Sequence, residues 1–335
     1  MVVCICCSLN STDNNSITGV GFAPDFTWIK ATANAYDHML FDALRGTGSL
    51  RENLRSNTSS ASDNDATNVK TLDSDGFTLG VGGYVNNSVT FASWNWKANG
   101  AGSANTDGSI NSTVSANTTS GFSIVTWTGN SGNVGHGLGV KPAMIITKSL
   151  GASGGWYTTH KSLGAEMQDN YIFLNTSDAN STNNDIWGGE PTTSTFSVGS
   201  GLIGNTTHVA YCFAEKKGFS KFGSYTGNGN ADGAFVYTGF KPAMVLFKQS
   251  SASGEKWYIY DNKRNAFNIT NSVLFPNASD AESSATTGAP IDMLSNGFKL
   301  KGTDAAGNGS GSTYIYMAFA EEPLVSSNNI PATAR

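Results

Sequence analysis

Apolar residues occur along this chain in short runs, and stretches of Ser, Thr, Asn and Gly separate the runs. Within a run the apolar positions alternate or are continuous, which is typical of β-strands buried on one or both faces. Only the segment 161–169 has the composition of one or two helical turns, and no sustained helical stripe with caps follows. The pattern therefore predicts an all-β protein made of short strands.

One strand phrase occurs three times and identifies an internal repeat. It reads GFAPDFTWIK at 21–30, GVKPAMIITK at 139–148 and GFKPAMVLFK at 239–248. Proline cannot donate a hydrogen bond to a β-ladder, so it is expected where a strand begins. These repeated prolines are Pro24, Pro142 and Pro242.

A second matched strand closes each repeat. Its copies are VTFASWNWK at 89–97, HVAYCFAE at 208–215 and YIYMAFAE at 314–321. Alternation puts Trp94 and Trp96 on one face, which corresponds to Tyr211 and Phe213, and then to Met317 and Phe319. We expect this face to be core, because burial of one such side chain is worth about 1.5–3 kcal/mol. Trp96, Phe213 and Phe319 are therefore predicted to be structural repeat positions.

The repeats predict three tandem antiparallel β-sandwiches of the jelly-roll or concanavalin-like type. Their predicted limits are 1–97, 121–218 and 219–325, with a Ser/Thr/Asn/Gly-rich linker or extended crossover at 98–120 and a tail at 326–335. Three similar domains in one chain can also stand around a pseudo-threefold axis and imitate a trimer.

Charge and hydropathy exclude several classes of partner. Charged residues are 13% of the chain, against about 25% in an average soluble domain. The net charge is −5 without a basic block, so nucleic acid is not an expected partner. No apolar run approaches the ~20 residues that span a bilayer, so no membrane association is expected. The segment 1–10 lacks the basic start and cleavage pattern of a signal peptide.

The cysteines and histidines predict neither a metal centre nor a catalytic centre. The four cysteines are Cys4, Cys6, Cys7 and Cys212, and no histidine or second cysteine pair completes a tetrahedral set. His160 aligns with Asp42 and Asp261 of the other repeats, which indicates a polar position and not a catalytic base. A Ser/His/Asp triad assembled across loops stays open, because its order and spacing are free. We expect no catalytic residue and no cofactor.

Two pairs of aspartates have the spacing of possible calcium ligands. They are Asp63 with Asp65, and Asp73 with Asp75. In the third repeat the second pair is replaced by LSNGF, with Asn296 in place of Asp75 and no carboxylate. A role in turns explains both sequences and is preferred.

Two aromatic residues in Gly-rich loops are the weak candidates for a binding site. Trp187 lies in IWGGEP and Tyr84 lies in GGYVNN. A solvent-facing ring can stack on a sugar, whereas a ring that folds back onto its own domain only adds to the core.

Long segments of the chain resemble a family of virion proteins of marine tailed phages, which are usually described as tail-fibre or uncharacterised structural proteins. The segments are ITGVGFAPDFTWIK at 17–30, DSDGFTLG at 73–80, and the runs 96–130, 134–148, 219–248 and 294–302. The resemblance implies a β-rich particle component of cyanophages or of phages of marine heterotrophs, and it supplies no catalytic residues. Family members often have sequence before the first strand, so an attachment domain is expected to be absent here or encoded elsewhere.

Three functions follow as hypotheses. The first is a non-enzymatic virion surface protein, of tail-fibre, adhesin or capsid-decoration type, that binds other virion proteins and, as an adhesin, a host glycan. The second is a carbohydrate-binding module whose Gly/Asn/Ser loops form the sugar site. The third is a polysaccharide depolymerase.

Overall fold

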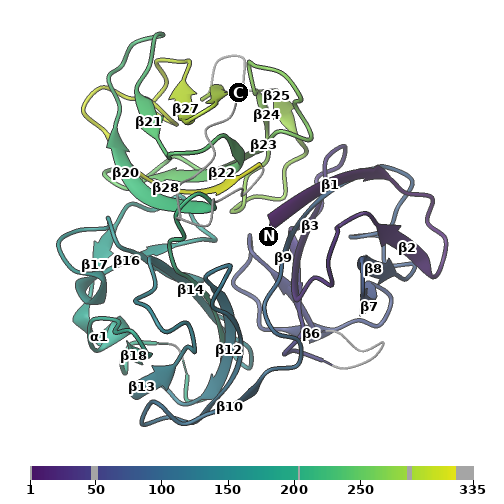
Figure 1. The fold of residues 1–335 in the computed structure, drawn as a ribbon, viewed down its shortest axis with the longest axis vertical. Coiled ribbons are helices and arrows are strands. Elements are labelled where there is room, and N and C mark those ends of the chain that lie inside the picture. Colours follow the sequence, from purple (N-terminus) through teal and green to yellow (C-terminus); the bar gives the residue numbers. More distant parts are fainter. Residues whose placement is uncertain (1, 47–51, 203, 285–288, 322–335) are drawn as a thin grey trace.

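The computed structural model describes residues 2–46, 52–202, 204–284 and 289–321, and for 2–8 it describes the backbone alone. In this part the chain is nearly all-β, with several antiparallel sheets. The strands form three lobes, which we call lobe 1 (β1–β9), lobe 2 (β10–β19) and lobe 3 (β20–β28) (Figure 1). The predicted tail at 326–335 lies outside the described residues. No helix among the described residues has the length and apolar character needed to cross a bilayer.

Lobe 1 is built on a six-stranded antiparallel sheet. In spatial order it contains β1 (Val2–Ser8), β9 (Thr90–Trp96), β3 (Phe26–Ala31), β4 (Met39–Asp42), β5 (Glu52–Arg55) and β6 (Asp63–Asn64). A three-stranded sheet of β2 (Asn15–Thr18), β8 (Gly76–Leu79) and β7 (Val69–Asp73) packs against one face of it.

Lobe 2 is built on an eight-stranded sheet. Its order is β10 (Ser103–Asn105), β11 (Ser112–Asn117), β12 (Phe122–Thr128), β19 (Thr207–Phe213), β14 (Met144–Ser149), β15 (Tyr157–His160), β16 (Asn170–Phe173) and β17 (Ser181–Thr182). A smaller pair is formed by β13 (Gly132–Gly135) and β18 (Thr195–Val198). Two short helical segments lie between β13 and β18 in the chain. They are a 3₁₀ turn at Met167–Asp169, within the predicted helical segment, and α1 (Asn184–Trp187), which was not predicted.

Lobe 3 repeats this plan with fewer strands. Its main sheet has the order β20 (Ser220–Thr226), β28 (Thr313–Ala320), β22 (Pro242–Gln249) and β23 (Trp257–Asp261). Its smaller sheets are β21 (Phe235–Tyr237), β27 (Gly297–Leu300) and β26 (Ile291–Leu294), and β24 (Ser272–Val273) with β25 (Ser283–Ser284).

The prediction of a linker at 98–120 needs correction. This segment forms β10 and β11, and β11 pairs with β12 along its whole length, from Ser112 opposite Trp127 to Asn117 opposite Phe122. Its polar composition has a physical reason, because β10 lies at the edge of the sheet with largely exposed side chains. Edge strands with polar side chains resemble linkers in sequence.

The matched strands pair in the same register in each lobe. Trp96 lies opposite Phe26, Phe213 opposite Met144, and Phe319 opposite Met244. Pro24 and Pro142 stand two residues before β3 and β14, and Pro242 is the first residue of β22.

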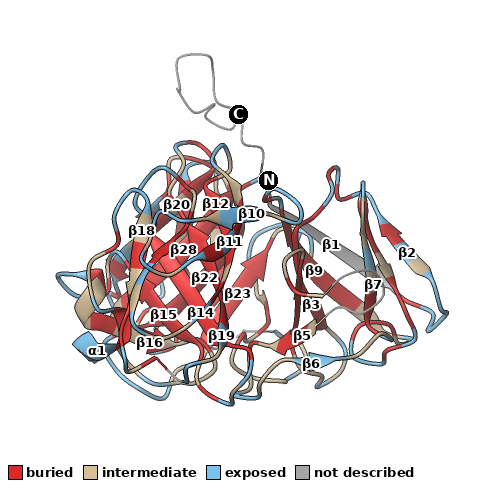
Figure 2. Cartoon of the chain, turned by 90° about the horizontal axis from the view of Figure 1, so that it is seen from below, coloured by how far each residue is buried: buried red, intermediate tan, exposed pale blue. Residues whose placement is uncertain are grey.

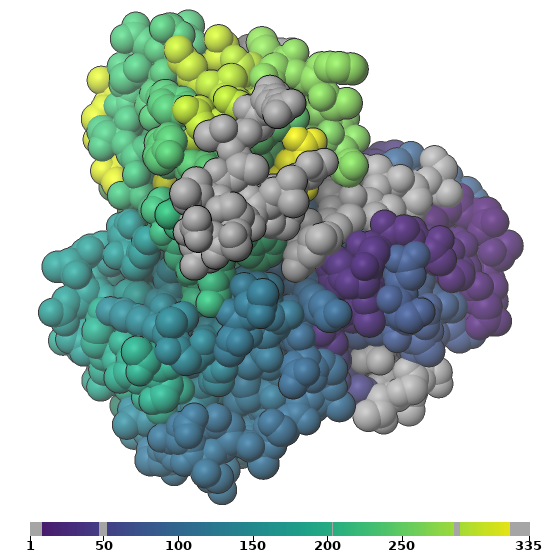
Figure 3. All heavy atoms as spheres, in the orientation of Figure 1, coloured from purple at the N-terminus to yellow at the C-terminus, as the bar shows by residue number. Residues whose placement is uncertain are grey.

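Among the described residues the core has four parts, and the largest is shared by all lobes. Three apolar clusters lie between the main and smaller sheets of single lobes. The fourth contains the opposite face of the main sheets and joins residues of lobes 1, 2 and 3. Both faces of the central strands are therefore covered, and Figure 2 shows them as buried. In the space-filling view the three lobes lie in direct contact (Figure 3).

Candidate functional site

The three repeated aromatic positions meet at the centre of the molecule. The ring centroids lie 6.3 Å apart for Trp96 and Phe213, 5.9 Å for Trp96 and Phe319, and 6.3 Å for Phe213 and Phe319. All three side chains are buried. Aromatic pairs at such distances stabilise each other beyond the area that they bury. Here the rings hold three lobes together.

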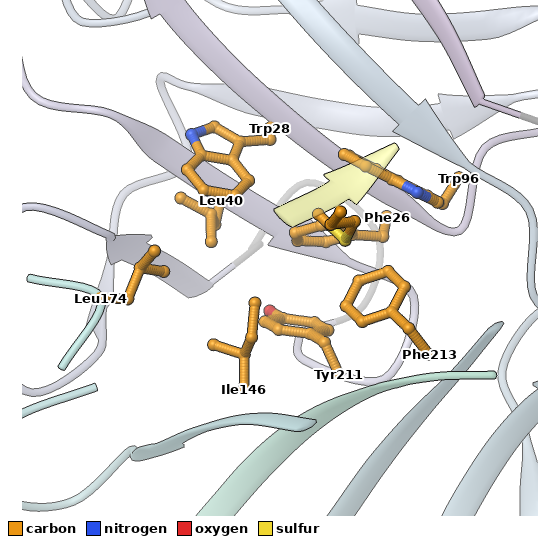
Figure 4. A pocket seen from close by; sticks show the side chains of 9 residues that line it. Phe26, Trp28, Leu40, Trp96, Ile146, Leu174, Tyr211 and Phe213 are labelled. Atoms are coloured by element: carbon orange, nitrogen blue, oxygen red, sulfur yellow. The ribbon is translucent and has the colours of Figure 1, made fainter. Parts of the chain in front are cut away.

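A small cavity lies beside these rings (Figure 4). Its volume is about 10 Å³, which is at the lower limit for a single water molecule. The lining is apolar and comes from all three lobes: Phe26, Trp28, Leu40, Trp96, Ile146, Leu174, Tyr211, Phe213 and Met317. The centre of the molecule is thus a packed core and not a ligand site.

A buried ion pair of lobe 1 is hydrogen-bonded to a tyrosine of lobe 2. Arg45 Nε donates to Asp42 Oδ2 at 2.6 Å, and both side chains are almost fully buried. Tyr211 Oη of lobe 2 donates to the same Asp42 oxygen at 2.7 Å and accepts from Arg45 Nη2 at 3.2 Å. Burial alone disfavours the guanidinium charge, but Asp42 and Tyr211 outweigh burial and raise the pKa of Arg45. The charge pair is therefore fixed at the junction.

The junction of lobe 3 with lobe 1 has the same design. Arg264 Nε donates to Asp261 Oδ2 at 2.6 Å. Trp94 Nε1 of lobe 1 donates to that oxygen at 3.3 Å, and the guanidinium lies 5.7 Å from the Trp94 ring centroid. Trp94 corresponds to Tyr211 in the predicted alignment, so matched residues make matched contacts.

The junction of lobe 2 with lobe 3 replaces the charges with a neutral pair. His160 and Leu163 stand where the other lobes have Asp and Arg. His160 Nδ1 accepts from the Ser162 amide at 3.1 Å, so Nε2 carries the proton and donates to the Tyr316 carbonyl at 3.2 Å. Asp42 and Asp261 accept the corresponding amides of Leu44 and Lys263. Burial lowers the pKa of His160 to about 3, so this ring is neutral at pH 7.

Backbone hydrogen bonds close the same ring of lobes. The amides of Ser62, Asn180 and Glu282 donate to the carbonyls of Leu150, Ser250 and Thr32, at 3.0, 2.9 and 2.7 Å. These bonds link the loops that follow β5, β16 and β24 to the hairpin loops β14–β15, β22–β23 and β3–β4 of the next lobe, respectively. Two tryptophans add bonds between lobes, from Trp156 Nε1 to the Arg55 carbonyl and from Trp257 Nε1 to the Phe173 carbonyl.

The remaining histidines also have structural surroundings. His38 Nδ1 accepts from Trp28 Nε1 at 2.8 Å, and burial lowers the pKa of its ring well below the usual value. His136 Nδ1 accepts from the Leu138 amide at 3.1 Å. His208 stacks on Trp127 at 5.2 Å. The rings therefore act as packed hydrogen-bonding groups.

The lysine that ends each repeated phrase is buried. Lys30 Nζ donates to the Ala31 and Asn34 carbonyls, Lys148 Nζ to the Ser59 and Gly154 carbonyls, and Lys248 Nζ to the Gln249 carbonyl. Burial lowers the pKa of each ammonium group to about 8. Carbonyl oxygens thus hold three cations in the interior.

These lysines predict a stability that rises with pH. Between pH 8 and the unfolded pKa of 10.5, the unfolded chain binds more protons than the folded chain, so the free energy of unfolding increases with pH. One lysine contributes up to about 1.4 kcal/mol per pH unit. We expect Lys248→Met to reduce the slope of the free energy of unfolding against pH between pH 8 and 9, measured by urea unfolding. This pH interval lies below the range where tyrosines titrate. The exposed Lys217→Met is the control, and an unchanged slope in Lys248→Met would refute this interpretation.

The aspartates considered as calcium ligands form turn contacts. Asp75 accepts the amides of Gly19 and Gly21 at 3.0 and 2.5 Å, and Asp65 accepts the amide of Thr67 at 2.9 Å. Asp63 binds Arg55, and Asp73 accepts from the Thr78 hydroxyl. Within the described residues no group of three or more His, Cys, Asp or Glu side chains is placed to hold a metal ion. Cys212 is buried, and the side chains of Cys4, Cys6 and Cys7 are outside the described set.

Trp187 must be removed from the binding candidates. It ends the short helix α1, its side chain is 1% exposed, and it packs in the core of lobe 2. Asn183 caps the helix start by accepting the Asp185 amide, and Gly188 ends it in a left-handed conformation. This turn folds the indole inward, so a sugar cannot reach it.

Tyr84 remains exposed and lines a surface pocket. Its side chain is 42% exposed, and the pocket of about 310 Å³ is bordered by Ala35, Tyr36, Asp37, Gly83, Tyr84 and Ser279. The sequence identified the Tyr84 loop but not its partners, because Tyr36 comes from a different loop and Ser279 from a different lobe. Sequence analysis also missed Arg45 and Arg264, although the spacing Asp-x-x-Arg at matched positions was a usable signal.

Comparison with known proteins gives a family and no function. A search of curated proteins and a search of solved structures each found no significant match. One family model, described as Domain of unknown function (DUF7483), matches residues 6–323 and so spans all three lobes. The chain therefore belongs to this family, Domain of unknown function (DUF7483).

Proposed function

We propose that this protein is a non-enzymatic structural protein on the surface of a bacteriophage virion, of tail-fibre, adhesin or capsid-decoration type. The observation that carries the proposal is the use of the repeated residues. Trp96, Phe213 and Phe319 pack together, and the positions of Asp42 and Asp261 join neighbouring lobes. The chain thus uses its most repeated side chains to build one body, as a particle component requires.

The proposed architecture is three tandem β-sandwiches of jelly-roll or concanavalin-like type around a pseudo-threefold axis. The common register of the central strands supports it, and so do the matched backbone bonds between lobes. A body of this shape imitates a trimer and suits assembly with other virion proteins. The resemblance to marine phage virion proteins, noted on the sequence, points in the same direction.

The surface pocket beside Tyr84 favours carbohydrate binding as the second candidate function. An adhesin binds host glycans, so this function is compatible with the first. A depolymerase is the third candidate, and it needs two carboxylates that face each other across a bound sugar. Buried carboxylates such as Asp42 and Asp261 are instead paired with arginine.

Antibody labelling of intact particles tests the proposal. Antibodies raised against the purified chain are expected to bind purified phage particles that encode it, and mass spectrometry is expected to find the chain in the same particles. Absence of the chain from purified, infectious particles would contradict the proposal. Cleavage of a host polysaccharide by the purified chain would favour the depolymerase instead.

A further inference from the structure

The pocket beside Tyr84 combines two aromatic rings with polar groups at the junction of lobes 1 and 3. Tyr36, Asp37, Gly83 and Tyr84 come from lobe 1, and Ser279 comes from lobe 3. Its volume of about 310 Å³ lies in the range of small-ligand sites. The lobes are tied together beneath it, because Ser56 Oγ donates to the Pro276 carbonyl at 2.6 Å and the Glu282 amide donates to the Thr32 carbonyl. The two walls are therefore held in place.

The aromatic wall presents both a flat face and a hydroxyl group. Tyr36 and Tyr84 lie edge to face with centroids 5.8 Å apart, and the exposed Tyr84 ring borders the pocket. Asn87 Nδ2 donates to Tyr36 Oη at 2.9 Å, so the phenol proton of Tyr36 can be donated to a ligand. A pyranose ring has an apolar C–H face and polar edges, which match this combination.

The polar wall contains the partly exposed carboxylate of Asp37, which is paired with the Arg55 guanidinium. Asp37 Oδ1 accepts from Asn57 Nδ2 at 2.6 Å, and Asp37 Oδ2 lies 3.4 Å from Arg55 Nε. The Arg55 guanidinium carbon lies 5.7 Å from the Tyr84 ring centroid. A carboxylate has about four lone-pair positions, so Asp37 can accept from a ligand hydroxyl group while Arg55 and Asn57 hold it in place. The Asp37 charge at the pocket is already balanced by Arg55, and Arg55 also pairs with Asp63 at 2.7 Å, which favours a neutral ligand over an ion.

Lobes 2 and 3 carry other residues at the positions of Asp37 and Arg55. In lobe 2, Gly155 and Phe173 stand at the positions of Asp37 and Arg55, and a Cβ on Gly155 would lie 2.3 Å from the Phe173 ring. In lobe 3 the pair is Lys256 and Phe275, with the ammonium 4.4 Å from the ring centroid. A phenylalanine ring thus fills the space where lobe 1 keeps a polar pair.

We propose that the pocket of Tyr36, Asp37 and Tyr84, with Arg55 paired to Asp37, binds one neutral hexopyranose unit of a surface polysaccharide. The inference rests on the proposed attachment function and names the ligand class for it. Tyr84 stacks on the sugar face, Asp37 and Tyr36 bind its hydroxyl groups, and Arg55 holds the Asp37 carboxylate in place.

Saturation-transfer NMR and calorimetry with glucose, galactose, mannose and N-acetylglucosamine test the site, with glucuronate as the anionic comparison. At least one neutral sugar is expected to bind with a dissociation constant of about 1 mM, and glucuronate to bind more weakly. Tyr84→Ala is expected to weaken binding by about tenfold or more. Arg55→Phe, which copies lobes 2 and 3, is expected to weaken it similarly while leaving the thermal midpoint close to that of the wild type. Tyr237→Ala is the matched control, because Tyr237 is 64% exposed in lobe 3 and lies outside this pocket.

Absence of signal from every neutral sugar would overturn the inference, as would preference for glucuronate or unchanged binding in Tyr84→Ala. These results are independent of particle labelling. A chain found on particles that binds no sugar would contradict this inference alone, whereas a chain absent from particles that binds sugar would contradict only the virion proposal.

Discussion

Replacing Arg45 by alanine is expected to lower the free energy of unfolding by about 3–5 kcal/mol. The substitution leaves the Asp42 carboxylate buried without the guanidinium that donates to it at 2.6 Å. It also removes the Arg45 bond to Tyr211 of the neighbouring lobe. Urea unfolding at pH 7, followed by fluorescence, measures the effect.

The chain itself offers the control for this prediction. Lobe 2 carries His160 and Leu163 at the corresponding positions, so the double variant Asp42→His, Arg45→Leu copies a junction that the protein already uses. Replacing a whole buried ion pair costs much less than breaking it. The double variant is therefore expected to be clearly more stable than Arg45→Ala. If Arg45→Ala lowers the free energy of unfolding by less than about 1 kcal/mol, or if the double variant is less stable than Arg45→Ala, the ion pair is not what stabilises this junction.

Replacing Phe213 by alanine is expected to cost about 3–5 kcal/mol, the range for deletion of a large buried ring. Phe213 contacts Trp96 of lobe 1 and Phe222 and Phe319 of lobe 3, so the cavity opens where the lobes meet. The loss is expected to appear in calorimetry as a lower midpoint of the main transition.

Phe267→Ala serves as the matched control, because the same ring type is 86% exposed in lobe 3. Surface substitutions of this kind usually change stability by no more than about 0.5 kcal/mol. Equal effects of the two substitutions would show that the centre does not hold the lobes together.

The local features of the fold could be predicted from the sequence. Proline cannot donate a hydrogen bond inside a β-ladder, so Pro24, Pro142 and Pro242 indicated where a strand begins. Strand alternation also placed Trp94 and Trp96 on one face. His160 stands at the position where each of the other two lobes has an aspartate. This correspondence already indicated a polar structural role.

The contacts between lobes could not be predicted, because they join residues that are far apart in the chain. Tyr211 and Asp42 are separated by 169 positions, and nothing local specifies that pairing. Trp187 was uncertain for a related reason, since a loop aromatic has the same local sequence whether it turns inward or outward. The exposed character of β10 likewise made an edge strand look like a linker.

Reconstruction of the phage particle by electron cryomicroscopy tests the central claim most directly. The account predicts density for a three-lobed body on the outer surface of the capsid or tail, with its three centre-facing sheets converging on Trp96, Phe213 and Phe319. Particles whose surface density is fully explained by other chains, with no place for this body, would contradict it.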